Sequence, residues 1–179
     1  MKAVVLPPFL IQHCEQWLAI IVVSLQTNYI IMALINAELT HPEFGFTIKD
    51  ITGSNEMKID IPADQGGHGQ GMRPMQTVLA ALTGCSGVDV VSILKKQRQE
   101  YSGLKILVDG EREKGKEPSL WETVHVRFEF EGTVDPAKAY RAAELSINKY
   151  CSVAETLRRG GTKISFAVVV NGVKFEVKS

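Results

Sequence analysis

The chain has 179 residues and a formal net charge of zero at pH 7, because its 20 basic side chains balance its 20 acidic ones. This length fits one domain of common size, or one domain with an appendage. A neutral chain lacks the basic patch of a general nucleic-acid binder, so we expect no nucleic-acid partner. Its 45% hydrophobic residues exclude wholesale disorder, and three cysteines exclude a disulfide scaffold and favour a reducing, cytoplasmic location.

The first 31 residues differ in composition from the rest. Lys2 is the one basic residue before position 49, and residues 17–25 form a largely apolar run. This run is shorter than the roughly 20 apolar residues of a membrane span. We therefore interpret 1–31 as an apolar N-terminal extension that packs on the domain or a partner subunit. The alternatives are an upstream extension before a natural start at Met32, and a signal peptide or membrane anchor. A single domain is expected over 32–179, without membrane association.

Short strands are predicted over residues 33–40 and 43–51, and alternating apolar and polar residues predict a third over 56–61. The segment 65–71 follows, with four glycines in seven residues, and predicts a flexible loop. It has neither the P-loop pattern nor the spacing of a dinucleotide fingerprint, so it does not indicate phosphate binding.

Apolar residues recur at steps of three and four from Met75 to Leu94, which predicts a buried helix beginning at Pro74. Gly84 and Gly87 flank Cys85 within it. Because glycine is costly inside a helix, the pair predicts either a kink or very close packing at this point.

Strands are predicted over 104–113 and 120–132. Asp135 and Pro136 begin a second long helix that closes at Arg158-Arg159, and residues 162–178 form a hairpin turning at Asn171-Gly172. The predicted order is βββ-α-ββ-α-ββ. This is an α+β fold with two long, cysteine-bearing helices packed on antiparallel sheet.

Cys85 and Cys151 both fall on the apolar stripe of a predicted helix. They are either buried hydrophobes or a redox pair, in which one thiolate is oxidised by a peroxide and the other condenses with it to a disulfide. Such a thiolate needs a positive charge, a helix N-terminus or a hydrogen-bond donor nearby. A helix interior supplies no N-terminal dipole, so we expect a side chain to do this.

Residues 72–86 (MRPMQTVLAALTGCS), continued by 88–94 (VDVVSIL), resemble the first-cysteine helix of the OsmC/Ohr family, and residues 146–153 (SINKYCSV) resemble the second. The similarity covers roughly residues 33–179. The resemblance implies an intertwined α+β homodimer with two sites at its interface. It also implies a thiol-dependent peroxidase of oxidative-stress defence, with an organic hydroperoxide as substrate and a dithiol as reductant. By position, Cys85 resembles the peroxidatic cysteine and Cys151 the resolving one.

Two residues of the peroxidase members are replaced. The arginine of the turn after the first strand is absent from residues 40–43 (THPE), and the glutamate after the helix-starting proline is Met75 here, followed by neutral Gln76. Gln76 and Asp89 are candidate supporting residues. Asp89 is either a buried acid bound to an amide or arginine, or a proton acceptor for a thiol. Since an ionised carboxylate raises the pKa of a neighbouring thiol, we expect a slower thiol centre than in complete members.

No cofactor and no metal site are expected, because the four histidines show no paired ligand spacing and Cys14 beside His13 is weak evidence. The main alternative to a peroxidase is a noncatalytic or redox-sensing dimer that binds a small apolar ligand or a thiol partner at its interface. A third is a structural protein with inert core cysteines.

Overall fold

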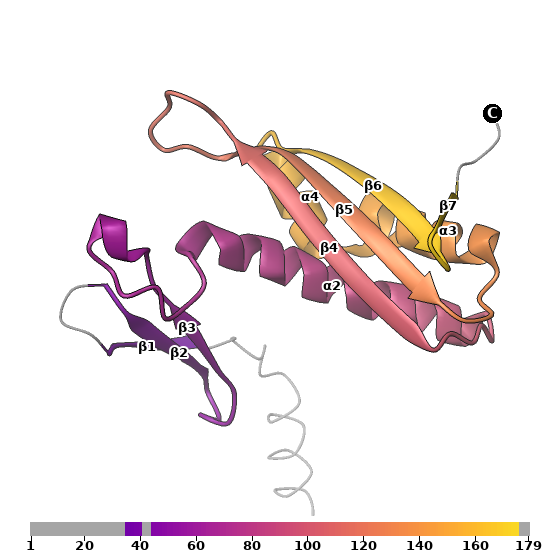
Figure 1. The fold of residues 1–179 in the computed structure, drawn as a ribbon, viewed down its shortest axis with the longest axis horizontal. Helices are drawn as coiled ribbons and strands as arrows, with labels where there is room; N and C mark the ends of the chain where they lie inside the picture. The colour runs from indigo at the N-terminus through magenta and orange to yellow at the C-terminus, as the bar shows by residue number, and fades with distance from the viewer. Residues whose placement is uncertain (1–34, 41–43, 176–179) are drawn as a thin grey trace, which may run out of the picture.

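The computed structural model describes residues 35–40 and 44–175, which form the predicted α+β fold (Figure 1). The extension predicted over 1–31 lies outside these residues. In chain order the elements are β1 (Ile35–Leu39), β2 (Phe46–Asp50), β3 (Glu56–Ile59), η1 (Ala63–Gln65), α2 (Pro74–Lys96), β4 (Gly103–Arg112), β5 (Trp121–Glu131), α3 (Pro136–Leu145), η2 (Ser146–Tyr150), α4 (Ser152–Arg159), β6 (Lys163–Val170) and β7 (Val173–Phe175).

The strands form two separate sheets, ordered β1-β2-β3 and β4-β5-β6-β7. Figure 1 shows the three-stranded sheet beyond the N-terminal end of α2 and the four-stranded sheet alongside the rest of that helix. The expectation of a wholly antiparallel sheet is wrong at one pair, because β5 and β6 run parallel. The cause is the helical crossover through α3, η2 and α4, which returns the chain to the same end of the sheet.

Strand β5 forms the centre of the core. Its inward side chains Val124, Val126, Phe128 and Phe130 are at most 1% exposed. On the opposite face Arg127 Nε forms an ion pair with Glu129 Oε1 at 2.9 Å. The predicted alternation of apolar and polar residues in this strand is confirmed, and the helices pack against its apolar face.

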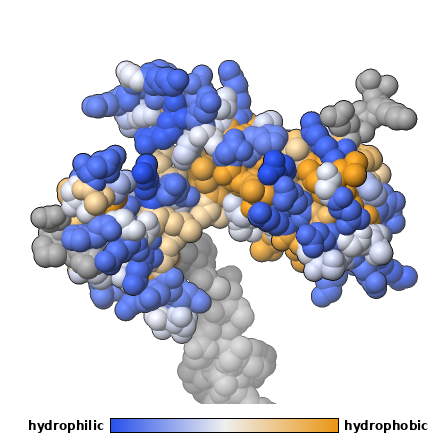
Figure 2. Space-filling view, viewed as in Figure 1, coloured by the Kyte–Doolittle hydropathy of each residue, from blue (hydrophilic) through white to orange (hydrophobic). Residues whose placement is uncertain are grey.

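Helix α2 is less buried than its apolar spacing predicts. Its fully buried stripe is narrow and consists of Leu82, Ser86, Val90 and Leu94. Val88, predicted to be core, is 71% exposed, because α2 packs one face on the sheet and the other helices and leaves the opposite face uncovered. Figure 2 shows hydrophobic residues gathered at the centre of the molecule, where this helix runs.

The glycines of α2 cause no break, since the helix is continuous from Pro74 to Lys96. A Cβ added to Gly87 would lie 2.9 Å from Cδ1 of Ile106 on β4, whereas one added to Gly84 would meet nothing within 4 Å. Close packing, rather than a kink, therefore explains the glycine at 87. By length and composition alone, α2 would also suffice to cross a membrane.

The glycine-rich segment 65–71 is anchored rather than free, contrary to the expected flexible loop. Asp60 is 2% exposed, and its carboxylate accepts the backbone N–H groups of Ile61 at 2.7 Å and of His68 and Gln70 at 3.1 Å. A Cβ on Gly67 would lie 2.1 Å from the carbonyl oxygen of Ile61, so only glycine fits there. These contacts fix the chain that leads into α2.

Replacing Asp60 by asparagine should release this segment, and the amide hydrogens of His68 and Gln70 should exchange about tenfold faster. The donated N–H groups, that of Gln70 foremost, hold the pKa of Asp60 below its ordinary value. The stabilisation is thus complete above that ordinary value, about 3.9, and is lost as pH falls through the lower value of the folded state. Hydrogen exchange at neutral and acidic pH tests this, with exposed Asp64→Asn as the control. Unchanged exchange in Asp60→Asn at neutral pH would contradict the assignment.

Candidate functional site

The two cysteines singled out from the sequence lie together in the fold. Cys85 is half-buried in the middle of α2, and Cys151 lies at the start of α4 and is 2% exposed. Their sulfur atoms and a carboxylate oxygen of Asp89 all lie within 4.8 Å of one another. Because a disulfide bond is about 2.05 Å long, the sulfurs need to approach by at most about 3 Å to form one.

The chain around Cys151 differs from the predicted continuous helix. Helix α3 ends at Leu145, a wider turn follows over Ser146–Tyr150, and the N–H of Cys151 donates to the carbonyl of Ser146 at 2.9 Å. Cys151 itself is extended, with φ −69° and ψ 107°, and caps α4. The prediction that Cys151 lies inside a helix is therefore wrong. Residues 146–152 (SINKYCS) are mostly poor helix formers, which is the signal that could have indicated this break.

Two opposing effects act on Cys151. The N–H of Ala154 donates to its Sγ at 3.4 Å, as expected of a residue that caps a helix. Burial, together with the adjacent Cys85 thiol, nevertheless raises the pKa of Cys151 to about 11. Cys151 is therefore a neutral thiol at physiological pH. It does lie at a helix N-terminus, which was not expected from the sequence, but this terminus does not outweigh the effect of burial on its pKa.

Asp89 is bound by a hydroxyl group rather than by the amide or arginine considered from the sequence. The buried Ser146 lies with its Oγ 3.1 Å from Asp89 Oδ2 and 3.2 Å from the carbonyl oxygen of Ser86. This links α2 to the turn that precedes Cys151. Among residues 35–40 and 44–175, no lysine or arginine forms an ion pair with Asp89.

Two openings lead to this cluster. A cavity of about 650 Å³ borders Asp89, and one of about 350 Å³ borders Cys151. Tyr150 lines both cavities. Lys96 lines the cavity beside Asp89, and Lys149 lines the cavity beside Cys151. Asp89 and Cys151 thus border open cavities, whereas Cys85 lines neither cavity and is half-buried.

Gln76 lies away from the cysteines. Its side-chain oxygen accepts the backbone N–H of Arg73 at 3.0 Å and so caps the beginning of α2. Nine residues of helix place it about 14 Å from Cys85 along the axis. Within one chain, Gln76 therefore acts on the helix terminus and not on the thiols.

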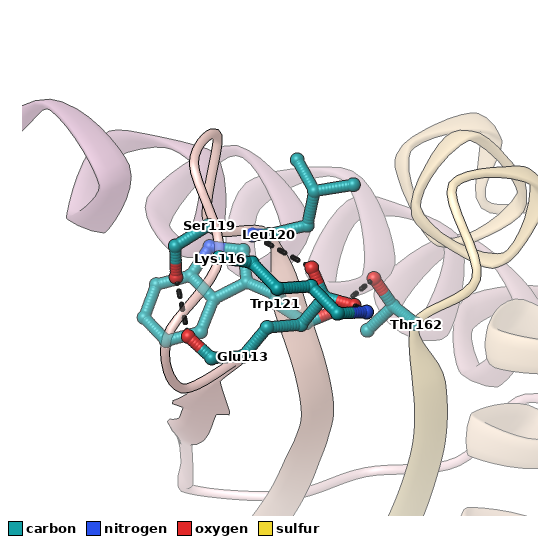
Figure 3. Close-up of polar contacts among 6 residues, drawn as sticks. All are labelled: Glu113, Lys116, Ser119, Leu120, Trp121 and Thr162. Carbon is teal, nitrogen blue, oxygen red and sulfur yellow. Dashed lines mark hydrogen bonds and ion pairs between the residues drawn. The ribbon is translucent and has the colours of Figure 1, made fainter.

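Gln76 instead borders a separate cavity of about 420 Å³ at the start of α2, lined also by Arg73, Met75, Arg112 and Trp121. Figure 3 shows how Trp121 is held beside it: Thr162 Oγ1 donates to the Trp121 carbonyl at 2.8 Å. The indole N–H is buried and, among the described residues, has no hydrogen-bond partner. Sequence reasoning missed this cavity because Trp121 resembles an ordinary first residue of a buried strand.

Comparison with known proteins assigns the chain to a family and supports the fold. The family model described as "OsmC-like protein" matches residues 67–167, which include α2 and Cys151. The chain belongs to the OsmC-like family. Protein YhfA of Escherichia coli K12 is 40% identical over 87 residues, which cover 48% of this chain and 64% of YhfA. The OsmC-like chain thus matches less than two thirds of the length of this relative.

Solved structures share the OsmC-like architecture. A hypothetical protein from Aquifex aeolicus VF5 is 32% identical, with a TM-score of 0.64, over 78% of this chain and 98% of its own. An organic hydroperoxide resistance protein OsmC from Legionella pneumophila is 13% identical, with a TM-score of 0.62, over 80% and 100% of the two chains. OhrB, the organic hydroperoxide resistance protein of Bacillus subtilis, is 18% identical, with a TM-score of 0.56, over 79% and 98%. The last two likenesses establish the fold alone.

Two arginines that follow Cys151 in this OsmC-like chain have side-chain partners of their own. Arg158 donates to Asn148 Oδ1 at 3.0 Å, and Arg159 pairs with Glu155 at 2.8 Å. Of the turn that carries the arginine in peroxidase members, residues 41–43 lie outside the described part of the chain. Among the described residues, the site therefore combines two thiols with a carboxylate that forms no ion pair, and Lys149 and Arg159 line the cavity beside Cys151.

Proposed function

We propose that the chain is a thiol-dependent peroxidase that reduces organic hydroperoxides in oxidative-stress defence. One observation carries this: the thiols of the half-buried Cys85 and of Cys151 lie within 4.8 Å of each other, and Cys151 borders an open cavity. Two inert core cysteines would not need such access. Membership of a family whose solved members include proteins named for organic hydroperoxide resistance supports the same chemistry.

The proposed reaction has two steps on the protein. The Cys85 thiolate attacks one peroxide oxygen, the O–O bond breaks, the alcohol leaves with a proton, and Cys85 becomes a sulfenic acid. Cys151 then attacks the sulfenic sulfur, water leaves, and a disulfide forms. A dithiol reduces this disulfide by thiol exchange and restores both thiols. Cys85 is assigned the first step because it is the more exposed cysteine, whereas Cys151 is buried and protonated.

Consumption of cumene hydroperoxide with a dithiol as reductant tests the proposal. We expect turnover in the wild type and in Cys14→Ser, and none above background in Cys85→Ser. Equal consumption by Cys85→Ser and the wild type would overturn it. The expected slowness of the centre is tested by the pH dependence of Cys85 alkylation, since a pKa below about 6, against an ordinary 8.5, would show a fully activated thiol.

A noncatalytic or redox-sensing role is the second candidate. The observation that favours it is the raised pKa of Cys151, together with the lack of an ion pair to Asp89 among the described residues. A sensor would form the disulfide on exposure to hydroperoxide, but the dithiol would restore it too slowly for turnover. Intact mass after stoichiometric oxidation, compared with steady-state consumption, separates the two.

We also propose that the chain acts as a homodimer. The three-stranded sheet leaves large apolar side chains exposed, including Ile35 at 59% and Leu39 at 54%, and α2 exposes Val88 and Val91. Such faces on one molecule are typical of surfaces that a partner covers. A second copy of the chain is the partner that the family resemblance implies, and the cytoplasm is its proposed location.

Replacing Val88 by glutamate should weaken this dimer by at least roughly 30-fold, because it places a charge in the covered face. Val173→Glu is the matched control, since Val173 is also 71% exposed but lies on β7. Sedimentation equilibrium measures both dissociation constants. Equal association of Val88→Glu and the wild type would show that this face of α2 is not the interface.

A further inference from the structure

The cluster of Cys85, Asp89 and Cys151 has the ligand atoms of a metal site as well as a pair of thiols. Its three ligand atoms come from two helix positions one turn apart, Cys85 and Asp89, and from the start of α4, Cys151. We propose that the reduced cluster binds one thiophilic divalent cation, of the class that Zn²⁺ represents, through Cys85 Sγ, Cys151 Sγ and a carboxylate oxygen of Asp89.

The distances fit such an ion after a small adjustment. Zn²⁺ binds thiolate sulfur at about 2.3 Å and carboxylate oxygen at about 2.1 Å, so tetrahedral ligand atoms lie roughly 3.4–3.8 Å apart. The three atoms already lie within 4.8 Å of one another. Rotation about the side-chain bonds of the half-buried Cys85 and Asp89 can supply the remaining shift of about 1 Å.

The surroundings of the cluster resemble the support that metal ligands require. Ser146 lies 3.1 Å from Asp89 Oδ2 and can fix the orientation of that carboxylate. The Ala154 N–H donates to Cys151 Sγ at 3.4 Å and would stabilise the negative charge of a bound thiolate. Three protein ligands leave a fourth position, and the cavities that border Asp89 and Cys151 offer access to it.

Charge also favours a cation. When the two thiols release their protons on binding, the three ligands together carry three negative charges, and among the described residues no lysine or arginine forms an ion pair with Asp89. A divalent ion reduces this excess to one. The affinity would be selective for thiophilic ions, because two of the three ligands are sulfur and hard ions such as Mg²⁺ prefer oxygen.

A bound ion would compete with the redox reaction for the same sulfurs. Oxidation would expel it: two thiolates, one hydroperoxide and two protons give a disulfide, an alcohol, water and the free ion. This consequence rests on the proposed peroxidase function, but binding itself does not. The ion would therefore slow the reaction of the reduced pair with hydroperoxide, and oxidation of both thiols would release it.

Titration of the reduced, chelator-washed full chain with Co²⁺ tests the site, because thiolate-to-cobalt charge transfer absorbs in the near ultraviolet in proportion to the number of thiolates bound. We expect one Co²⁺ per chain with two thiolates, displaced by an equal amount of Zn²⁺. Cys85→Ser and Cys151→Ser should each halve the absorption per bound ion and weaken binding by 100-fold or more, and Asp89→Asn by about 10–100-fold. Cys14→Ser should leave the spectrum unchanged.

The proposal is overturned if the wild type shows no charge-transfer band, or if Cys85→Ser and Cys151→Ser show a band per bound ion as strong as that of the wild type. Circular dichroism on each variant identifies any that fails to fold, and Asp89→Asn, which keeps both thiols, then decides. Hydroperoxide consumption in the presence of chelator gives an independent result. A chain that turns over but binds no Co²⁺ refutes only the metal site, and one that binds Co²⁺ without turnover refutes only the peroxidase.

Discussion

The Cys151→Ser variant should reduce one equivalent of hydroperoxide and then become over-oxidised at Cys85. Without a neighbouring thiol, the Cys85 sulfenic acid cannot condense to a disulfide and reacts with further peroxide to the sulfinic or sulfonic acid. In the wild type the Cys151 sulfur, within 4.8 Å and shielded from solvent, intercepts it first. The effect is qualitative, because a reversible cycle becomes a single irreversible event.

Intact mass after excess cumene hydroperoxide without reductant measures this. Both proteins carry Cys14→Ser as background, so that only the two clustered thiols remain. We expect a loss of about 2 Da in the Cys14→Ser protein, and a gain of about 32 or 48 Da when Cys151→Ser is added. A loss of about 2 Da in both would mean that Cys85 is protected by a group other than Cys151.

The raised pKa of Cys151 adds a pH dependence to the second step. Only the thiolate attacks a sulfenic sulfur efficiently, and with a pKa of about 11 its fraction rises about tenfold per pH unit from neutral pH upward. Over-oxidation of the wild type should accordingly decrease as pH rises. A rate of disulfide formation that is flat between pH 6 and 9 would show that oxidation of Cys85 lowers the pKa of its neighbour.

The elements predicted best from the sequence are those in which one continuous apolar face produces a regular spacing of apolar residues. The alternation from Val124 to Phe130 placed β5, and the spacing after Pro74 placed α2 with its correct start. The pairing of Cys85 with Cys151 followed from the family resemblance, since positions 66 residues apart carry no local signal of contact.

What the sequence could not predict depends on neighbours distant in the chain. Val88 fits the apolar stripe of α2 as well as Leu82 does, but only the tertiary arrangement decides which of them is covered. The Ser146 hydroxyl that binds Asp89 comes from another element, so an amide or arginine seemed as good a partner. The break before Cys151 lies within an apolar stripe that a continuous helix would also satisfy, so the weak helix formers of residues 146–152 were its one local signal, and the contact of Ser146 with Ser86 on α2 lies far away in the sequence.

The Phe128→Ala variant should lose about 3–5 kcal/mol of folding stability. Phe128 is fully buried on the central strand and lies opposite Ile106 on β4 and Val168 on β6, so the strands on both sides limit the collapse of the resulting cavity. Urea unfolding at one fixed protein concentration measures the loss as a lower midpoint with an unchanged slope. Arg127→Ala is the adjacent control, and since its ion pair with Glu129 is largely exposed we expect a loss within about 1 kcal/mol. Equal losses in the two variants would mean that the β5 face does not support the helices. Helices α2 and α4, which position Cys85 and Cys151, pack on this core. A less tightly packed core should therefore also slow disulfide formation between the two cysteines.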